Sequence, residues 1–586
     1  MNGHPGQTAV SGRPLALLGP FFRQHRYQLA TGFAALLGVD ALQLCVPRLL
    51  KRGVDLLAVG RGSARDLLLV SLAILAIGIG VTVLRFVWRT RIIGFSRRLE
   101  HGLRIRLIHH ILGLDRPFFD RHSTGDIMAH AANDLSAVQM ACGMGMVAAV
   151  DALVMSLAAI TFMLLIDVRL TLIALAPMPL LALCARMLTR RLHRNFDKVQ
   201  AQFSLLTEFA RTTLVSIRLI KAYTQEALQK GSFDRLGREY VRRNLGVAVI
   251  QGLLFPVATM VGNTGMLLVL LFGGRLVISG TISMGDFVAF VTYLHMLVWP
   301  MMAVGWVANL AQRGLTSLGR IRLLLAARPV LENSATEEPP KQPRPVFHCQ
   351  GLSFTYRETS HPALEQVDLR LYPGITGLTG PTGSGKSTLC KLLTRQYPVD
   401  PGMLFLDGRD VNQLPLHWVR RQIAYVSQDP VLLSWTIGEN IRLGAPEATD
   451  AEVEEAARLA ALHEDILQFP EGYDTRLGER GVNLSGGQKQ RLALARALVC
   501  RRPILILDDG LSALDVETEE EIFRNLRARL EGRTVLLVSH RLKVLQLAAS
   551  IVILEQGRVT DRGQHGELLA RNAFYRAVAR RQGLLQ

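Results

Sequence analysis

Long apolar stretches and short apolar runs divide this 586-residue chain into two unlike parts. A helix needs about 20 apolar residues to cross a bilayer, and six stretches in roughly the first 310 positions suit that length. They lie near 27–50, 67–93, 137–165, 168–188, 246–274 and 284–308. Beyond position 346, short apolar runs alternate with helical patterns, which is typical of an α/β domain around a mainly parallel sheet.

A polar, proline-rich segment separates the two patterns. Residues 337–345 contain four prolines and can neither continue a helix nor build a core. The sequence therefore predicts an α-helical six-span transmembrane domain over 1–330, a linker over 331–345 and an α/β domain over 346–586.

Positive charge supports a membrane setting for the first part. The net charge is +19, and arginines concentrate in the two long connections at 89–121 and 190–243. Basic connections stay in the cytoplasm, so the chain is expected to be a multi-pass protein of the cytoplasmic (inner) membrane, with its α/β domain in the cytoplasm. Anionic lipid is the expected counter-charge, and nucleic acid is not an expected partner.

Other compositional signals exclude several classes. The six cysteines are scattered singly, so neither a zinc site nor a disulfide framework is expected. The polar N-terminus has no apolar core of a signal peptide, and the first apolar stretch is expected to remain in the mature protein.

Two of the predicted spans carry notable groups of polar, methionine or aromatic side chains. In the first span they recur at intervals of three and four, on one helix face: Asp40, Gln43, Pro47, Lys51 and Asp55. This stripe and Asp151 of the third span are equally compatible with helix–helix hydrogen bonds and with substrate contact. The sixth span carries His295, Met296, Trp299, Met301, Met302 and Trp306, which suit a promiscuous pocket but which core packing explains more simply.

A glycine-rich loop in the second part has the pattern that binds nucleotide phosphates. It follows an apolar strand near 375–378, opens a helix near 389–393, and reads Gly380, Pro381, Thr382, Gly383, Ser384, Gly385, Lys386, Ser387 and Thr388. Its backbone N–H groups would cradle phosphate, Lys386 would reach the β- and γ-phosphates, and the Ser387 hydroxyl would ligate Mg²⁺. ATP and Mg²⁺ are thus the expected cofactors.

The apolar run at 504–507 ends in two carboxylates, Asp508 and Asp509. An ATP-hydrolysing site keeps its Mg²⁺ ligand at the first of these positions, so Asp508 completes the expected Mg²⁺ shell. A base must lie within hydrogen-bond reach of the water that it deprotonates, and the Asp509 arm is about 1.5 Å shorter than that of Glu. We therefore expect a site that binds ATP well and hydrolyses it poorly.

A further motif points to a family. The segment Leu484, Ser485, Gly486, Gly487 and Gln488 follows Gly478–Gly481 and precedes Gln490 and Arg491. It strongly resembles the signature of ABC transporters, and six spans before one nucleotide-binding domain resemble a half-transporter of the exporter type, type IV. In this family the signature faces the nucleotide held by an opposing domain, so two such domains must meet head to tail.

The resemblance also assigns roles to single residues. Tyr356, at the end of a strand expected over 351–356, would stack on adenine. Gln428 would sense Mg²⁺ and water, His540 would be the switch histidine, and Ser512–Asp515 would form the D-loop. Segments near 123–133 and 216–225 resemble the coupling helices that dock on the ATPase.

The departure from the family is Asp509, where its catalytic Glu should stand. The resemblance therefore implies a heterodimer whose other half-transporter supplies the Glu, with this chain retaining ATP at its own site. The leading hypothesis is ATP-driven, multidrug-like export of hydrophobic or amphipathic compounds. A lipid or peptide exporter, a homodimeric transporter, and an ATP-gated channel or regulator are the alternatives.

Overall fold

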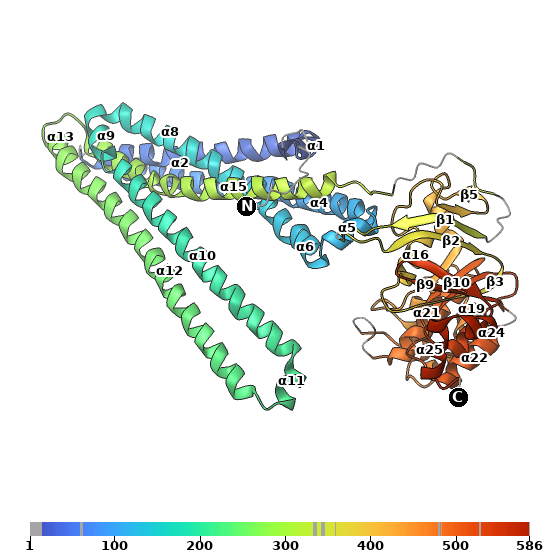
Figure 1. The fold of residues 1–586 in the computed structure, drawn as a ribbon. Coiled ribbons are helices and arrows are strands. Elements are labelled where there is room, and N and C mark those ends of the chain that lie inside the picture. Colours follow the sequence, from blue (N-terminus) through green and yellow to red (C-terminus); the bar gives the residue numbers. More distant parts are fainter. Residues whose placement is uncertain are drawn as a thin grey trace. The chain divides into compact units, whose positions relative to one another are not determined.

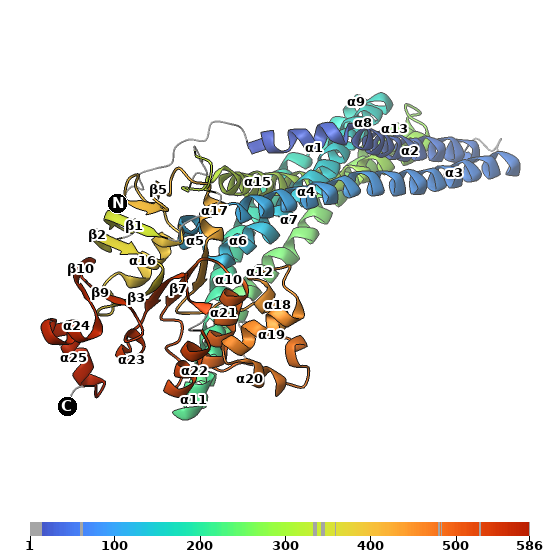
Figure 2. The same ribbon diagram turned by 90° about the vertical axis from the view of Figure 1, so that its right-hand side faces the viewer.

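The computed structural model describes residues 14–58, 63–331, 337–340, 346–357, 359–478, 481, 483–526 and 529–584. The chain forms two compact units. The first comprises the chain up to residue 113 together with 122–327, and the second comprises 114–121 together with 328–586. Figures 1 and 2 show long helices in the first unit and an α/β body in the second. Residues 332–336 and 341–345 of the expected linker lie outside the described residues.

The first unit is built of helices, and several long ones are interrupted only by single π-helical turns. They are α1 (Gly19–Gln24), α2 (Arg26–Ala58), α3 (Ala64–Trp88) with α4 (Gly94–Leu112), α6 (Thr124–Ala129) with α7 (Leu135–Met140) and α8 (Met146–Ile166), α9 (Val168–Leu175), α10 (Met178–Val215), α11 (Ile217–Ala222), α12 (Glu226–Leu268), α13 (Gly274–Ile278), α14 (Met284–Met296) and α15 (Val298–Ala326). Reciprocal capping boxes start two of them, Ser63 with Asp66 at α3 and Ser283 with Asp286 at α14.

Four helices in the described part of the chain are long and apolar enough to cross a membrane. They are Arg26–Ala58, Ala64–Leu112, Thr124–Ile166 and Met284–Ala326. The fourth and fifth expected spans fall on α9–α10 and on α12–α13, where Asn263–Ile278 is a shorter apolar helix. Six spans therefore remain a prediction, and four are supported by length and composition.

Helices α10 and α12 run side by side as an antiparallel pair that α11 closes at one end (Figures 1 and 2). The expected second coupling segment, 216–225, coincides with α11 and its flanks. Apolar side chains are exposed at this tip, among them Val215, Leu219 and Tyr223.

Two members of the polar stripe on α2 tie that helix to the start of α14. Asp55 accepts hydrogen bonds from the Gly285 backbone N–H at 2.8 Å and from the Ser283 hydroxyl at 3.0 Å. Lys51 forms a 2.5 Å ion pair with Asp286. For Lys51 and Asp55 the structure thus favours helix–helix bonding, the first of the two expected explanations.

The short helix α5 (Arg116–Arg121) belongs to the second unit, although it lies between segments of the first. Asp115 accepts the backbone N–H groups of Val330 at 2.5 Å and Leu331 at 2.8 Å, and Asp120 accepts the Tyr397 hydroxyl at 2.5 Å. The expected first coupling segment, 123–133, lies instead in the helical unit. Docking of 123–133 on the ATPase therefore stays a prediction, whereas the contacts described here come from carboxylates just upstream.

Two sheets form the frame of the second unit. The six-stranded sheet has the order β10-β9-β3-β8-β7-β6, with only β10 antiparallel, and the four-stranded antiparallel sheet has the order β2-β1-β4-β5. The strands are β1 (Phe347–Phe354), β2 (Leu364–Leu371), β3 (Gly374–Thr379), β4 (Leu404–Leu406), β5 (Arg409–Asp410), β6 (Ile423–Val426), β7 (Ile504–Asp508), β8 (Thr534–Val538), β9 (Ser550–Glu555) and β10 (Arg558–Gly563).

Helices cover both faces of the six-stranded sheet. The α-helices described after residue 346 are α16 (Lys386–Leu393), α17 (Leu416–Arg421), α18 (Ile437–Arg442), α19 (Asp450–Leu459), α20 (His463–Leu467), α21 (Gly486–Val499), α22 (Val516–Leu526), α23 (Leu542–Leu545), α24 (His565–Arg571) and α25 (Ala573–Arg581). Strand β7 is buried on both sides: Leu505 and Leu507 pack with α21 and α22, whereas Ile504 and Ile506 pack with α16. Alternation along a strand therefore carries Asp508 toward α16.

Candidate functional site: a nucleotide-binding loop and its partners

The loop between β3 and α16 is shaped by glycines that no other residue replaces without strain. Gly380, Gly383 and Gly385 have φ values of +152°, +81° and +101°. A Cβ on Gly380 would lie 1.9 Å from the Leu554 carbonyl oxygen, and one on Gly385 would lie 2.5 Å from that of Ala363. At Gly383 no atom lies within 4 Å, so this glycine leaves open space. The result is a backbone cradle at the start of α16, where N–H groups attract an anion.

Lys386 lies at this cradle and is buried. Its Nζ donates to the carbonyl oxygens of Gly380 at 2.9 Å and Pro381 at 2.8 Å. Burial lowers the pKa of the amine, while Asp509 and Asp508 raise it. The amine is therefore bonded to neutral carbonyl oxygens. Phosphate oxygens of a nucleotide would take their place as acceptors and form stronger, charge-assisted hydrogen bonds.

Ser387 and Asp508 meet beside the cradle. The Ser387 hydroxyl donates to Asp508 Oδ1 at 2.9 Å, and the Tyr425 hydroxyl donates to Oδ2 at 3.1 Å. Burial raises the Asp508 pKa, and these two hydrogen bonds lower it. A hydroxyl and a carboxylate at this separation fit neighbouring positions in the shell of a small, oxygen-preferring cation such as Mg²⁺.

Asp509 follows directly, where the chain leaves β7. Its φ is +51°, and its backbone N–H donates to the Val538 carbonyl at 3.1 Å. Burial raises the pKa of its carboxyl, His540 lowers it and Asp508 raises it. Burial and the positive charge of Lys386 lower the pKa of His540, which favours its neutral imidazole form. The structure thus brings Asp509, His540 and Lys386 into one electrostatic cluster.

Gln428 is placed differently from these residues. It is exposed on the loop after β6, and the described contacts give it no hydrogen bond to Ser387 or Asp508. The expected role of Gln428 as a cation ligand thus gains no support from geometry.

Tyr356 lies two residues beyond β1 and not within it. The strand expected over 351–356 is observed as β1 over Phe347–Phe354. Its pairing with β2 is irregular around Gly351, whose φ is +54°. The Tyr356 hydroxyl is 3.2 Å from Thr388 Oγ1, and its ring meets those of Phe354 and Tyr397 edge-on. Tyr397, which the sequence did not single out, links this ring to Asp120.

The signature segment starts α21 and is tightly capped. The Ser485 hydroxyl accepts the Gln488 backbone N–H at 3.2 Å, and the Gln488 side chain accepts the Ser485 N–H at 3.0 Å. Gly486 and Gly487 form the first turn, where a Cβ on Gly487 would approach Leu514 to 3.1 Å. Glu479 and Arg480, upstream of the signature, lie outside the described residues.

Two further residues hold the segment Ser512–Asp515, and sequence reasoning missed both roles. Gln490 donates to the Ser512 hydroxyl at 3.2 Å and accepts the Ala513 N–H at 2.8 Å. Arg541, next to His540, donates to the carbonyls of Leu514 and Ser512, each at 2.8 Å. Arg541 also pairs with the buried Glu519 at 2.9 Å. This segment is thus fastened to α21 on one side and to the His540 loop on the other.

Comparisons with known proteins agree with this geometry. Residues 29–301 match the family described as ABC transporter transmembrane region, and residues 364–512 match the family ABC transporter. The chain is 38% identical over 574 residues to "Multidrug resistance-like ATP-binding protein MdlA" of Escherichia coli, covering 98% of this chain and 97% of the relative. This chain is an ABC exporter half-transporter.

Other relatives of this ABC exporter widen the picture. It is 35% identical over 577 residues to the Bacillus subtilis "Probable multidrug resistance ABC transporter ATP-binding/permease protein YheI", covering 97% of this chain and 98% of the relative. It is 33% identical over 489 residues to an "ATP-dependent lipid A-core flippase" of Nitrosococcus oceani, covering 83% of this chain and 82% of the relative. A solved structure titled "Structure of a bacterial Atm1-family ABC exporter with ATP bound" superposes with a TM-score of 0.80 at 26% identity, covering 95% of this chain and 99% of that one.

The expected fold class is confirmed: a helical transmembrane domain and an α/β nucleotide-binding domain of the type IV exporter kind. The ABC exporter is a multi-pass membrane protein with a cytoplasmic nucleotide-binding domain, and its ATPase activity is coupled to transport. Its domain binds ATP.

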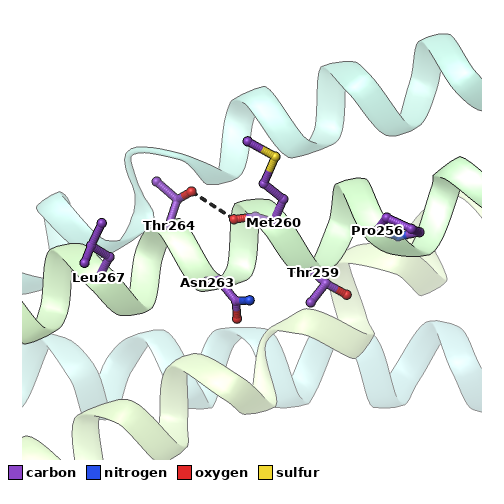
Figure 3. Close-up of a pocket in the computed structure, with 6 residues that line it drawn as sticks. All are labelled: Pro256, Thr259, Met260, Asn263, Thr264 and Leu267. Atoms are coloured by element: carbon purple, nitrogen blue, oxygen red, sulfur yellow. Dashed lines mark hydrogen bonds between the residues drawn. The ribbon is translucent and has the colours of Figure 1, made fainter.

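The helical unit of the ABC exporter carries an open hollow of about 680 Å³ along α12. Figure 3 shows the lining residues, which are Pro256, Thr259, Met260, Asn263, Thr264 and Leu267. They combine apolar and uncharged polar groups, and the Thr264 hydroxyl donates a hydrogen bond to the Met260 carbonyl at 2.8 Å. The sequence had directed attention to span six, whereas this hollow lies within the expected fifth span.

Proposed function

We propose that this chain exports hydrophobic or amphipathic compounds as the half-transporter that carries the weakly hydrolytic ATP site of a heterodimer. The observation that carries the proposal is Asp509, which stands directly after Asp508 at the end of β7. Its carboxylate arm is about 1.5 Å shorter than that of Glu, and a base out of reach of the attacking water costs about 10² to 10⁴ in rate.

The other groups at this site are those of a competent ATP-binding site. Gly380 and Gly385 let the loop pack closely on neighbouring backbone, and Gly383 leaves open space. Lys386 supplies a positive charge, and Ser387 with Asp508 would hold Mg²⁺. Bound Mg²⁺ would neutralise part of the negative charge of the phosphates. We therefore propose that this site binds ATP, holds the two nucleotide-binding domains closed, and releases nucleotide slowly.

The intact signature supports a dissimilar partner. A reciprocal capping box between Ser485 and Gln488 fixes the N-terminus of α21, which can complete a site on another subunit. That second site would then take its Lys, Mg²⁺ ligands and catalytic Glu from the partner half-transporter. Hydrolysis there would reset the cycle.

The substrate class is proposed from the names of the relatives and from the helical unit. Two relatives bear multidrug-resistance names, and the hollow on α12 mixes Met260 and Leu267 with Thr and Asn. Such a surface suits amphipathic ligands. Lipid export is the second candidate, because relatives named lipid A-core flippases match over 83% and 82% of this chain.

Purification from native membranes tests the partner, and vesicle uptake tests the export. We expect a second half-transporter with Glu after its strand-end Asp to co-purify. We also expect inside-out vesicles containing both chains to accumulate a lipophilic dye only with ATP, and vesicles with K386A in this chain to accumulate less. Recovery of this chain alone, together with uptake that does not need ATP, would contradict the proposal.

A further inference from the structure

The side chain of Gln582 bonds to the backbone on both sides of Arg541. Gln582 directly follows α25, and its Nε2 donates to the His540 carbonyl oxygen at 2.6 Å. Its Oε1 accepts the Leu542 backbone N–H at 2.9 Å. One amide group thus uses its donor and its acceptor on the same three residues, His540–Leu542, which are called the His540 loop below.

The His540 loop leaves the sheet beside the phosphate cradle. It follows β8, which lies between β3 and β7. The Ser539 backbone N–H donates to the Leu378 carbonyl oxygen at 3.2 Å, just before the cradle begins. On the other side, the Asp509 N–H donates to the Val538 carbonyl oxygen at 3.1 Å. The terminal phosphate of an ATP molecule in the cradle would therefore lie at the same sheet edge as His540.

Packing holds α25 and the far end of the His540 loop in place. Tyr575 and Ala579 of α25 are buried and pack in one core with Leu542 and Leu545. The Gln582 side chain therefore extends from a fixed helix, although it is itself exposed. Its replacement removes two hydrogen bonds and leaves the core residues of α25 unchanged.

The near end of the loop is less enclosed. The His540 side chain is exposed, and an open hollow of about 1090 Å³ lies along α22, Arg541, Val544 and Gln582. The loop backbone has space to shift on this side. The hydrogen bond from Gln582 to the His540 carbonyl limits such a shift.

A simple fastening of the chain end is the alternative explanation of these bonds. Leu542 is the first residue of α23, so its N–H has no acceptor within that helix, and Gln582 would only cap it. The second bond does not fit this explanation, because the His540 carbonyl lies outside the helix.

We infer that Gln582 is a positioning residue for His540: it fixes the backbone of the His540 loop so that the imidazole faces the γ-phosphate of ATP bound in the cradle. The inference rests on the ATP-binding part of the proposed function. It goes beyond that function by giving the C-terminal helix a part in recognising the γ-phosphate. ATP and ADP differ by this phosphate, so Gln582 should contribute to the affinity for ATP and not to that for ADP.

Binding of two nucleotides to the full-length chain in lipid nanodiscs tests the inference. The β,γ-imido analogue of ATP carries a γ-phosphate and resists hydrolysis, whereas ADP lacks that phosphate. Q582M keeps the size of the side chain and makes neither bond. It should weaken binding of the analogue about fivefold, as loss of about 1 kcal/mol implies. Its affinity for ADP should equal that of the wild type.

Replacing His540 distinguishes positioning from fastening. H540A should weaken binding of the analogue, and H540A/Q582M should bind it as H540A does, because Gln582 then has no imidazole to position. Q546M is the matched control. Gln546 also joins the end of α23 to α24, through His565 at 3.1 Å, but it lies beyond the His540 loop. Q546M should bind both nucleotides like the wild type.

Three results would overturn the inference alone: equal binding of the analogue by wild type and Q582M, an equal loss for both nucleotides, or a loss that persists when Q582M is added to H540A. A wild type that binds neither nucleotide would overturn the ATP-binding proposal and this inference with it. Hydrogen exchange in the nucleotide-free wild type tests the bond without a variant. The Leu542 N–H should exchange slowly, and rapid exchange there would also overturn the inference.

Discussion

The Ser387 hydroxyl donates to Asp508 at 2.9 Å, joining two residues that are 121 positions apart in the sequence. Ser387 lies in the first turn of α16 after β3, and Asp508 ends β7, with β8 between the two strands. Carboxyl ends of parallel strands meet at one edge of the sheet, and the alternation of β7 turns Asp508 toward α16. The two oxygen ligands expected for Mg²⁺ are therefore assembled by the fold itself.

The buried Asp508 carboxylate lowers the free energy of unfolding at neutral pH, and D508N should reveal this cost. Burial raises the pKa of Asp508 above its ordinary 3.8, so the folded protein binds this proton more tightly than the unfolded chain does. The contribution of Asp508 to the free energy of unfolding then falls as pH rises from 3.8 through the raised pKa of the folded protein. D508N should be more stable than wild type at pH 7 by about 1 kcal/mol, and the difference should shrink toward pH 4.

Thermal unfolding of nucleotide-free protein over this pH range checks that expectation. A D508N variant that is less stable than wild type at pH 7 would contradict it. The same variant should also lose the Mg²⁺ dependence of nucleotide binding, because it lacks the carboxylate that we propose as a ligand of this cation.

Two glycines of the cradle should respond differently to alanine. In G385A the new Cβ would lie 2.5 Å from the Ala363 carbonyl oxygen, at a φ of +101°. We expect a loss of about 3 kcal/mol in the free energy of unfolding. G383A is the matched control: its φ is also positive, but no atom lies within 4 Å. It should lose about 1 kcal/mol. Equal Tm values for the two variants without nucleotide would refute the steric explanation.

Replacing Lys386 should reduce nucleotide affinity and leave the fold intact. In K386A the charge-assisted bond to phosphate is lost, which should weaken binding of a fluorescent ATP analogue at least tenfold, or about 1.5 to 3 kcal/mol. K543A removes an exposed lysine from α23 and serves as control. If both variants bound the analogue equally well, Lys386 would not be the phosphate-binding residue.

Arg541 should stabilise the Ser512–Asp515 segment. R541A removes its bonds to two carbonyls of this segment and leaves Glu519, which is 4% exposed, without its ion-pair partner. We expect a cost of about 2 to 4 kcal/mol. Adding E519Q should recover part of this cost, because the buried charge is then removed. Thermal unfolding of the single and double variants measures the recovery, and its absence would contradict the pairing.

The sequence predicted those parts of the molecule that depend on local pattern. The phosphate loop, the strand before it and the strand ending in Asp508 could be read because glycine spacing and apolar runs are local signals. Residues that act across elements left no such signal. Gln490, Arg541 and Tyr397 bond to backbone or side chains of distant segments, and these partners cannot be read from the local sequence, even though Gln490 follows the signature and Arg541 follows His540.

The position of α5 shows the same limit. The resemblance pointed to a docking segment near 123–133 and gave no sign that α5 joins the second unit through Asp115 and Asp120, whose partners are Val330, Leu331 and Tyr397. Only folding reveals such pairings. In the helical unit, hydropathy predicted long helices but could not show that Asp55 bonds to the start of α14.

Single-turnover release of phosphate from purified chains tests most directly whether Asp509 is too short to act as a base. Wild-type protein without a second half-transporter should release phosphate slowly, and D509E should accelerate release about 100-fold, since a base within reach of the water contributes at least that much. ATP binding should be equal in the two proteins. Rapid release by the wild type, with no gain in D509E, would contradict the account.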